Sequence, residues 1–177
     1  GKNHPDTAAT YSNIGGVYDS QGNYARALEY YQKALAIREK VLDENHPDVA
    51  TSYYNIGGVY KSQGDYAEAL KYYEKALAIR EKVLGENHPD VATSYDNIAG
   101  VCYSQGDYAE ALKYNEKALA ICESVLGENH PYTATIYSNI GLVYEKQGDY
   151  ARAMEYYQKA LAIREKVLGE NHPKTAT

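Results

Sequence analysis

Residues 45–86 read NHPDVATSYYNIGGVYKSQGDYAEALKYYEKALAIREKVLGE, and almost the same sequence follows at 87–128. The two copies differ at seven positions, which in the first copy are 54, 57, 60, 61, 73, 80 and 82. Asn-His-Pro recurs every 42 residues, which gives repeats 3–44, 45–86, 87–128 and 129–170 and the start of a fifth at 171–177. Periods of roughly 20–50 residues are typical of solenoids, in which each unit packs on its neighbours. We therefore predict a single solenoid over 1–177.

The first half of each repeat has the pattern of a helix. Pro5 suits the first helical turn, and Asn3 or His4 can accept a hydrogen bond as the N-cap. Gly22 is expected to end the helix in the left-handed conformation. Small or apolar residues between these ends follow helical spacing, at Ala8, Tyr11, Ile14, Gly15 and Tyr18.

The second half of each repeat predicts a longer helix of about 18 residues. Asn23, replaced by Asp in the later copies, is its expected N-cap, and Glu68 and Glu110 are expected to complete capping boxes in repeats two and three. One face of this helix is apolar, with Ala27, Leu28, Tyr31, Ala34, Leu35, Val41 and Leu42. No stretch alternates with period two, so the predicted fold class is all-α.

These residues resemble the tetratricopeptide repeat signature, whose usual unit has about 34 residues. The resemblance is carried by Tyr11, Ile14, Gly15, Tyr18, Gly22, Tyr24, Ala27, Tyr31 and Ala34 and their equivalents. The longer period is similar to that of kinesin light chains and of bacterial multi-repeat proteins. The resemblance implies a right-handed superhelix of antiparallel helix pairs, a concave side lined by the first helix of each pair, and a non-catalytic scaffold for protein–protein interaction.

Composition and charge exclude several other classes. A net charge of -6 and a pI near 5.4 argue against nucleic acid or an anionic membrane as the partner. Apolar runs such as 34–37 are far shorter than the roughly 20 residues of a membrane-spanning helix. Cys102 and Cys122 are expected to lie about 18 Å apart along the helices, beyond disulfide reach. Free thiols predict a reducing compartment, and we expect a cytoplasmic protein.

Sequence motifs for catalysis are missing. No Ser-His-Asp order, phosphate-binding loop or dinucleotide fingerprint occurs. The repeat-equivalent histidines would lie one repeat apart and could not converge on one metal ion; they are His4, His46, His88, His130 and His172. We therefore expect no enzyme activity, no metal and no cofactor.

A stripe of first-helix positions is left over from packing and forms the candidate peptide-binding site. Its members are Ser12, Asn13, Gly16 and Asp19; Tyr54, Asn55, Gly58 and Lys61; Asp96, Asn97, Gly100 and Tyr103; and Ser138, Asn139 and Glu145, with Leu142 at the glycine position. The Asn recurs in all four copies, and its carboxamide can pair with the backbone of a bound peptide. Alternatively, this Asn bonds a neighbouring helix and fixes the stacking.

Glycines inside the first helices need a compensating reason, because each costs about 0.5–1 kcal/mol relative to Ala. We expect close helix–helix approach within a pair at positions 15, 57 and 141. At positions 16, 58 and 100 we expect an open floor for an extended peptide.

Repeat three departs most from its siblings and is the most acidic of the four. One interpretation is an acidic pocket around Tyr54, Asp96 and Tyr103 that takes a basic or polar side chain. The other is neutral drift in a redundant array. The stripe as a whole mixes charges, so it implies no single ligand charge.

The sequence thus predicts a binding module that holds an extended or short helical peptide segment on its concave face. One alternative is a structural module that stacks end to end with other copies. Another is a sensor domain that belongs to a larger signalling protein.

Overall fold

The computed structural model describes residues 4–169, and these form paired helices without any strand. The predicted all-α class and the helix pairs are confirmed. Asn3 and the predicted start of a fifth repeat at 171–177 lie outside the described residues. The chain divides into two compact units, residues 1–86 and 87–177, and the boundary coincides with the expected junction of repeats two and three. The single solenoid and its superhelical hand stay predictions.

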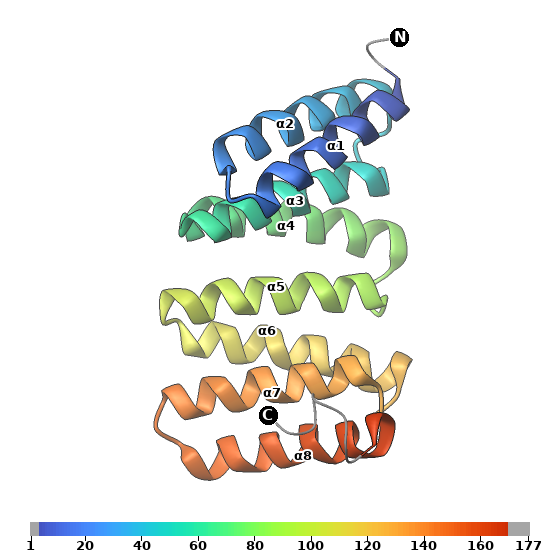
Figure 1. The fold of residues 1–177 in the computed structure, drawn as a ribbon. Helices are drawn as coiled ribbons and strands as arrows, with labels where there is room; N and C mark the ends of the chain where they lie inside the picture. Colours follow the sequence, from blue (N-terminus) through green and yellow to red (C-terminus); the bar gives the residue numbers. More distant parts are fainter. Residues whose placement is uncertain (1–3, 170–177) are drawn as a thin grey trace. The chain divides into compact units, whose positions relative to one another are not determined.

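Unit 1 contains two helical hairpins (Figure 1). The helices are α1 (Pro5–Ser20), α2 (Tyr24–Val41), α3 (Pro47–Gln63) and α4 (Tyr66–Leu84). α1 pairs with α2 and α3 pairs with α4, while α2 also packs on α3. The second helix of one repeat is therefore covered by the first helix of the next, as expected of stacked repeats.

Unit 2 repeats this arrangement with one difference. Its helices are α5 (Pro89–Gln105), α6 (Tyr108–Ile121), α7 (Pro131–Lys146) and α8 (Tyr150–Leu168), with a π-helix η1 (Cys122–Leu126) directly after α6. The sequence predicts one continuous α-helix here. Instead, the N–H of Gly127 donates to the carbonyl of Cys122, five residues back, at 3.0 Å. The Ser124 hydroxyl donates to the Ile121 carbonyl at 3.1 Å, and so competes for the acceptor that an α-helix would use at this point.

Histidines begin every first helix. Nδ1 of His46 accepts the backbone N–H of Asp48 at 3.1 Å, with Pro47 between them as the first helical residue. The same cap occurs at His4, His88 and His130. The second helices begin with an Asn or Asp cap, as predicted; Oδ1 of Asp65 accepts the N–H of Glu68 at 3.3 Å.

The predicted capping boxes at Glu68 and Glu110 are wrong. A capping box needs the N–H of the cap residue, but that of Asp65 already donates to the Tyr60 carbonyl at 2.9 Å across the left-handed Gly64. The carboxylate of Glu68 instead forms an ion pair with Lys71 at 3.0 Å. Glu110 does the same with Lys113 at 2.9 Å.

Tyrosine rings fill the space inside each hairpin. In unit 1 the buried core joins α2, α3 and α4 through Tyr31, Leu35, Ile56 and Ile79. Tyr31 is only 6% exposed, and its ring lies so close to Gly15 that a Cβ atom there would stand 2.9 Å from Cδ1. The predicted close approach at this glycine is therefore present, and only a residue without a side chain fits.

The described helices differ from membrane-spanning helices. None of those within residues 4–169 combines the length and the apolar character required to cross a bilayer.

Candidate functional site

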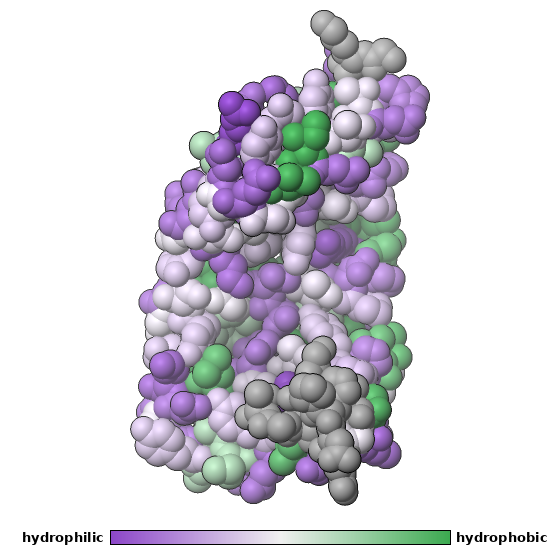
Figure 2. Space-filling model, in the orientation of Figure 1, coloured by the Kyte–Doolittle hydropathy of each residue, from purple (hydrophilic) through white to green (hydrophobic). Residues whose placement is uncertain are grey.

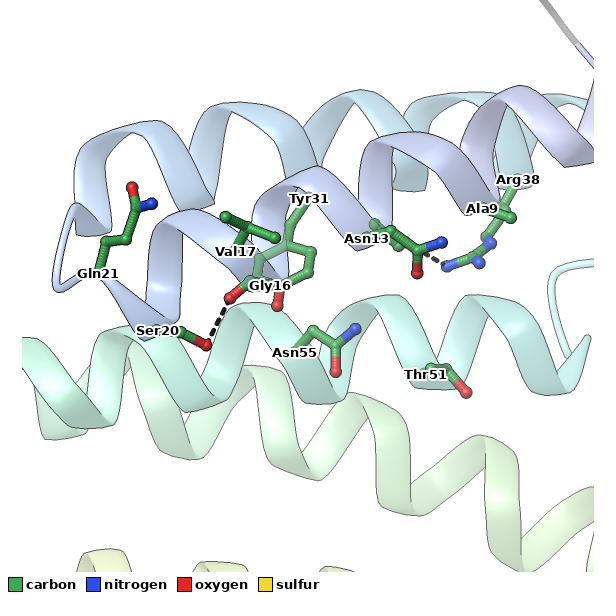
Figure 3. A pocket seen from close by; sticks show the side chains of 11 residues that line it. Ala9, Asn13, Gly16, Val17, Ser20, Gln21, Tyr31, Arg38, Thr51 and Asn55 are labelled. Carbon is green, nitrogen blue, oxygen red and sulfur yellow. Dashed lines mark hydrogen bonds between the residues drawn. The ribbon is translucent and has the colours of Figure 1, made fainter.

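Unit 1 carries an open pocket of about 800 Å³ between α1 and α3 (Figure 3). Most lining residues come from one side of α1, at Ala9, Ser12, Asn13, Gly16, Val17 and Ser20, with Gln21 at its end. Tyr31 and Arg38 of α2 and Thr51 and Asn55 of α3 complete the lining. The stacking of one repeat on the next therefore builds the pocket, since no single hairpin supplies all of its walls.

The floor of the pocket is the edge of Tyr31. A Cβ atom on Gly16 would lie 3.4 Å from its hydroxyl oxygen, so glycine keeps this hydroxyl uncovered from the α1 side. Burial raises the pKa of Tyr31, and the nearby charge of Asp19 adds to the shift. The phenol is therefore neutral and offers a hydrogen-bond donor to a guest.

Two carboxamides face the pocket from successive first helices. Asn13 is exposed on α1 and Asn55 is partly buried on α3. Neither side chain has a hydrogen-bond partner among residues 4–169, and both line the pocket. Each carboxamide therefore keeps its donor and its acceptor available.

Arg38 is the charged residue of the lining and stands at one end of the pocket, next to Asn13 (Figure 3). Its side chain lies among the buried residues of α2 and is only 8% exposed. Nη1 donates to the hydroxyls of Ser12 at 3.1 Å and Ser52 at 2.7 Å. No carboxylate within residues 4–169 forms an ion pair with this guanidinium.

Other predicted site residues of unit 1 lie outside the pocket lining. The Tyr54 ring packs against Tyr73, with ring centroids 5.6 Å apart, and beneath the Arg80 guanidinium at 4.9 Å. A Cβ atom on Gly58 would meet the Tyr73 hydroxyl at 3.7 Å. Asp19 and Lys61 are half-buried near the ends of their helices, and burial raises the pKa of Asp19. Of the unit 1 predictions, the pocket collects Ser12, Asn13, Gly16 and Asn55.

In unit 2 the repeated Asn contacts protein groups. Nδ2 of Asn139 donates to Oδ1 of Asp96 at 2.8 Å, which joins α7 to α5. Oδ2 of the same carboxylate accepts the Tyr132 hydroxyl at 3.3 Å. Burial raises the pKa of Tyr132, and the charge of Asp96 adds to the shift. Asp96 thus links two helices, and Asn139 here behaves as the stacking alternative describes.

The remaining predicted positions of unit 2 are engaged locally. Nδ2 of Asn97 donates to the Thr93 carbonyl at 2.7 Å, and the Ser138 hydroxyl donates to Ala134 O at 3.1 Å. These contacts lie within one helix. Three further predicted residues also have contacts. The carbonyl of Gly100 accepts the Ser104 hydroxyl at 2.9 Å, and the Tyr103 ring centroid lies 5.7 Å from that of Tyr108. The carboxylate of Glu145 accepts the Tyr157 hydroxyl at 2.7 Å.

Sequence reasoning missed several lining residues. Ala9, Val17 and Ser20 lie on the predicted stripe or beside it, and spacing of three and four residues from Asn13 and Gly16 could have found them. Arg38 had a different signal, because a charged residue recurs on the apolar face of the second helix four residues after Ala34. An arginine on such a face commonly buries its aliphatic stem, so the sequence pattern alone does not mark this position as part of a site. Its hydrogen bonds to Ser12 and Ser52 do so in the structure.

The described part of the chain shows neither a metal cluster nor a disulfide. No group of three or more His, Cys, Asp or Glu side chains within residues 4–169 is arranged to hold an ion. Cys102 and Cys122 are buried free thiols, as predicted. Burial raises the pKa of Cys122 to about 11, and the charges of Asp96 and Glu123 add to the shift.

The family model for tetratricopeptide repeats matches residues 6–82, 48–124, 90–166 and 134–177. The chain therefore belongs to the tetratricopeptide repeat family, whose members are commonly non-catalytic scaffolds for protein interaction. This confirms the resemblance of the 42-residue repeats to the tetratricopeptide signature. No curated protein matches the sequence.

Solved structures with kinesin-light-chain-like repeats are similar to this chain. BtubC (BKLC) from P. vanneervenii has a TM-score of 0.84 and 29% identity, over 96% of this chain and 68% of that one. A putative kinesin light chain with nearly identical TPR-like repeats from Podosopora anserina has a TM-score of 0.82 and 26% identity, over 97% and 82%. The apo form of RapI shares the fold at a TM-score of 0.78 and 22% identity, over 91% and 57%.

Proposed function

We propose that this chain is a non-catalytic scaffold whose unit 1 pocket binds an extended segment of a partner protein. The observation that carries the proposal is the pair of unpartnered carboxamides, Asn13 and Asn55, on successive first helices of one pocket. A peptide backbone in extended form presents N–H and C=O groups along its length. Each carboxamide can pair with such groups whatever the peptide side chains are.

The pocket also offers apolar contact beside its polar groups. Val17 lines it and is 57% exposed. Figure 2 shows a small hydrophobic patch over α1 amid mainly hydrophilic or intermediate surface. A mixture of apolar contacts and a few directed polar groups is typical of ligand pockets.

The proposed site is smaller than the stripe predicted from sequence. Asn97 and Asn139 use their Nδ2 groups on Thr93 and Asp96, so a peptide would have to break those bonds first. Asn13 and Asn55 carry no such cost. The proposal therefore assigns peptide contact to the unit 1 carboxamides and a packing role to Asn139.

The experiment begins with selection of random-sequence peptides displayed on phage against the full 177-residue chain. Selected peptides are then measured by fluorescence anisotropy against the Asn13→Ala/Asn55→Ala double variant. We expect at least a tenfold loss of affinity, because two neutral hydrogen-bond pairs contribute about 1 kcal/mol each. The urea midpoint should stay unchanged, since neither carboxamide bonds to the described protein.

Asn139→Ala is the matched control, because the same residue type is lost at an equivalent repeat position. It should leave peptide affinity unchanged and lower the stability of unit 2, where Asp96 loses a partner. Selection of no peptide above a bare control surface, or full affinity in the double variant, would contradict the proposal.

Self-association is a second candidate function, favoured by apolar side chains on α8. Leu161 is 39% exposed and Met154 is 58% exposed. The equivalent of Leu161 in α2 is Leu35, which is only 9% exposed and belongs to the core formed with α3. In unit 1 a first helix packs on the corresponding face of α2, so the first helix of another copy fits this face of α8.

Analytical ultracentrifugation over a range of protein concentrations tests this candidate. Association should increase with concentration and should disappear in a Met154→Glu/Leu161→Glu variant, because buried carboxylates without partners oppose the contact. A monomer at every concentration would remove the candidate without affecting the pocket.

The scaffold role includes a location and a partner class. We propose that the protein acts in a reducing compartment such as the cytoplasm, which the two buried free thiols support. The acidic net charge of -6 supports a protein partner over nucleic acid.

A further inference from the structure

Arg38 brings a buried positive charge to the junction of α1, α2 and α3. The side chain is 8% exposed, and its hydrogen-bond acceptors are the neutral hydroxyls of Ser12 and Ser52. None of the ion pairs among residues 4–169 includes this guanidinium. Buried charges in proteins are ordinarily paired, because their removal from water is costly. A negative ion taken from solution would therefore stabilise the folded protein.

The remaining donors of Arg38 reach the pocket. A guanidinium has five N–H groups, and the two serines occupy those on Nη1. Within residues 4–169, Oδ1 of Asn115 is the side-chain atom that is both sealed from solvent and unpartnered. Nε and Nη2 of Arg38 have no partner in this part of the chain and are not sealed, so they face the open pocket that the residue lines.

Two neighbours on α1 add donors to the same space. The Ser12 hydroxyl accepts from Nη1 but donates to no group within residues 4–169, so its hydrogen is available. Asn13 also has no partner there, and Figure 3 shows its carboxamide next to the guanidinium. By contrast, the Ser52 hydroxyl already donates to the Asp48 carbonyl at 3.1 Å. The end of the pocket beside Arg38 therefore offers one charged and two neutral hydrogen-bond donors.

We propose that this end of the pocket binds a chloride ion between Nε and Nη2 of Arg38, the Ser12 hydroxyl and an amide N–H of Asn13. Arg38 is the charged residue of the lining, so one ion of single charge balances it. A sulfate or phosphate of double charge would leave an uncompensated charge in a partly buried site. A spherical ion also accepts hydrogen bonds from any direction, which suits donors that come from two helices.

The chloride site is independent of the proposed peptide binding. One N–H of Asn13 is sufficient for the ion, and the second N–H and Oδ1 remain for a peptide. The ion acts on the stacking of the repeats, because Arg38 on α2 bonds Ser12 on α1 and Ser52 on α3. A ligand that binds only the folded state stabilises that state increasingly as its concentration rises. The chloride concentration thus sets how firmly the walls of the pocket are held together.

The other repeats differ at the positions that form this site. Repeat two has Arg80, but Tyr54 replaces the serine of the first helix, and its ring centroid lies 4.9 Å from the guanidinium. Repeat three has Cys122 and Asp96 at the two positions, and a carboxylate there repels an anion. Repeat four has Arg164, which is only half-buried. We therefore expect one chloride ion per chain.

The first test observes the site by NMR on the full 177-residue chain. Sodium fluoride is replaced stepwise by sodium chloride at constant ionic strength, since the smaller fluoride ion is more costly to remove from water. The Nε–H resonance of Arg38 and the side-chain amide of Asn13 should shift together along one saturable curve. Bromide, which has the same charge and shape as chloride, should reproduce these shifts, whereas sulfate should not.

The second test measures urea unfolding in the same mixtures of fluoride and chloride. Once chloride exceeds its Kd, the unfolding constant of the wild type should fall about tenfold for each tenfold rise in chloride. Arg38→Gln should remove this dependence. Arg26→Gln should keep it, because Arg26 is exposed and bonds the Tyr18 hydroxyl at 2.9 Å, away from the pocket. Circular dichroism shows whether both variants are folded.

Three results would overturn the inference. One is that the resonances of Arg38 and Asn13 do not respond to chloride. Another is that they respond to sulfate as strongly as to chloride, which would indicate general attraction of anions. The third is equal chloride dependence in the wild type and in Arg38→Gln. If Arg38→Gln does not fold, the wild-type titration decides, and the phage selection tests peptide binding separately.

Discussion

A Cβ atom on Gly57 would stand 2.9 Å from Cδ1 of Tyr73, in the helix with which α3 forms a hairpin. The same relationship holds between Gly15 and Tyr31 and between Gly141 and Tyr157. Repeat three has Ala99 and Asn115 at these two positions. The larger residue on the first helix is thus accompanied by a smaller one on the second, which indicates compensation within the hairpin.

Gly57→Ala should therefore destabilise unit 1, although Ala is the better helix former. Overpacking against a buried ring costs about 1–3 kcal/mol, whereas the gain in helix propensity is about 1 kcal/mol. A net loss of about 1 kcal/mol follows from these values. Urea unfolding followed by circular dichroism measures it.

Ala99→Gly is the matched control in repeat three. Asn115 stands at the position of Tyr73, so Ala99→Gly relieves no overpacking; it loses helix propensity and a buried methyl group, and stability should fall by roughly 1–2 kcal/mol. A gain in stability from Gly57→Ala would contradict the prediction, because it would mean that the Tyr73 ring moves away from the added methyl group without cost.

In chloride-free buffer, Arg38→Met should unfold at a urea concentration equal to or higher than that of the wild type. The replacement removes a buried charge that has only hydroxyl partners in unit 1. Exchange of buried charged groups for apolar ones of similar volume is often neutral or stabilising, and we expect a gain of up to about 1 kcal/mol. A large destabilisation would show that the bonds to Ser12 and Ser52 are principally structural.

Alkaline pH should weaken the contact between Tyr53 and Glu39. The hydroxyl donates to Oε1 of Glu39 at 2.7 Å, and burial followed by this hydrogen bond raises the pKa of Tyr53 from 10.0 to about 12. The folded pKa is above the unfolded one, so the stabilisation is complete below pH 10 and is lost as pH rises toward 12. The urea midpoint should fall over this interval.

Tyr53→Phe isolates that effect from other alkaline ionisations. The variant should lose stability less steeply than the wild type between pH 10 and 12. Tyr150→Phe serves as the control, because Tyr150 is 70% exposed. Parallel curves for wild type and Tyr53→Phe would contradict the prediction.

Cys122 should be inert toward thiol reagents while unit 2 is folded. The side chain is fully buried, and its raised pKa of about 11 keeps the thiol protonated at lower pH. In a Cys102→Ser variant, an aromatic disulfide reagent should release no thiolate until urea unfolds the protein. Immediate stoichiometric reaction would show that unit 2 opens at this helix.

The repeat pattern predicts the local structure well because its determinants are local. His-Pro caps, left-handed glycines and apolar stripes act within a few residues, so the sequence alone reveals each of them. The predicted capping boxes do not form, because the backbone N–H groups of Asp65 and Asp107 already donate to carbonyls at the end of the preceding helix. The π-helix depends on Ser124 and Cys122, which change hydrogen bonding without changing the apolar pattern.

The candidate site was harder to predict, because symmetry suggested the same role for every copy of the repeated Asn. Asn13 and Asn55 do line one pocket, while Asn139 pairs with Asp96, a residue that only repeat three carries at its position. Arg38 obtains its partners from two other helices, so no spacing along α2 alone reveals it. Such roles depend on contacts between repeats and need the fold.

Contacts inside a hairpin and contacts between hairpins have different consequences for genes that duplicate. Copies as alike as these recombine readily, and the breakpoint decides which partners remain together. Exchange of an entire hairpin keeps Gly57 with Tyr73 but separates pairs such as Arg38 and Ser52, which belong to adjacent copies. Shuffled arrays would therefore stay folded while gaining or losing charge at their junctions, so new specificities can arise without a single point mutation.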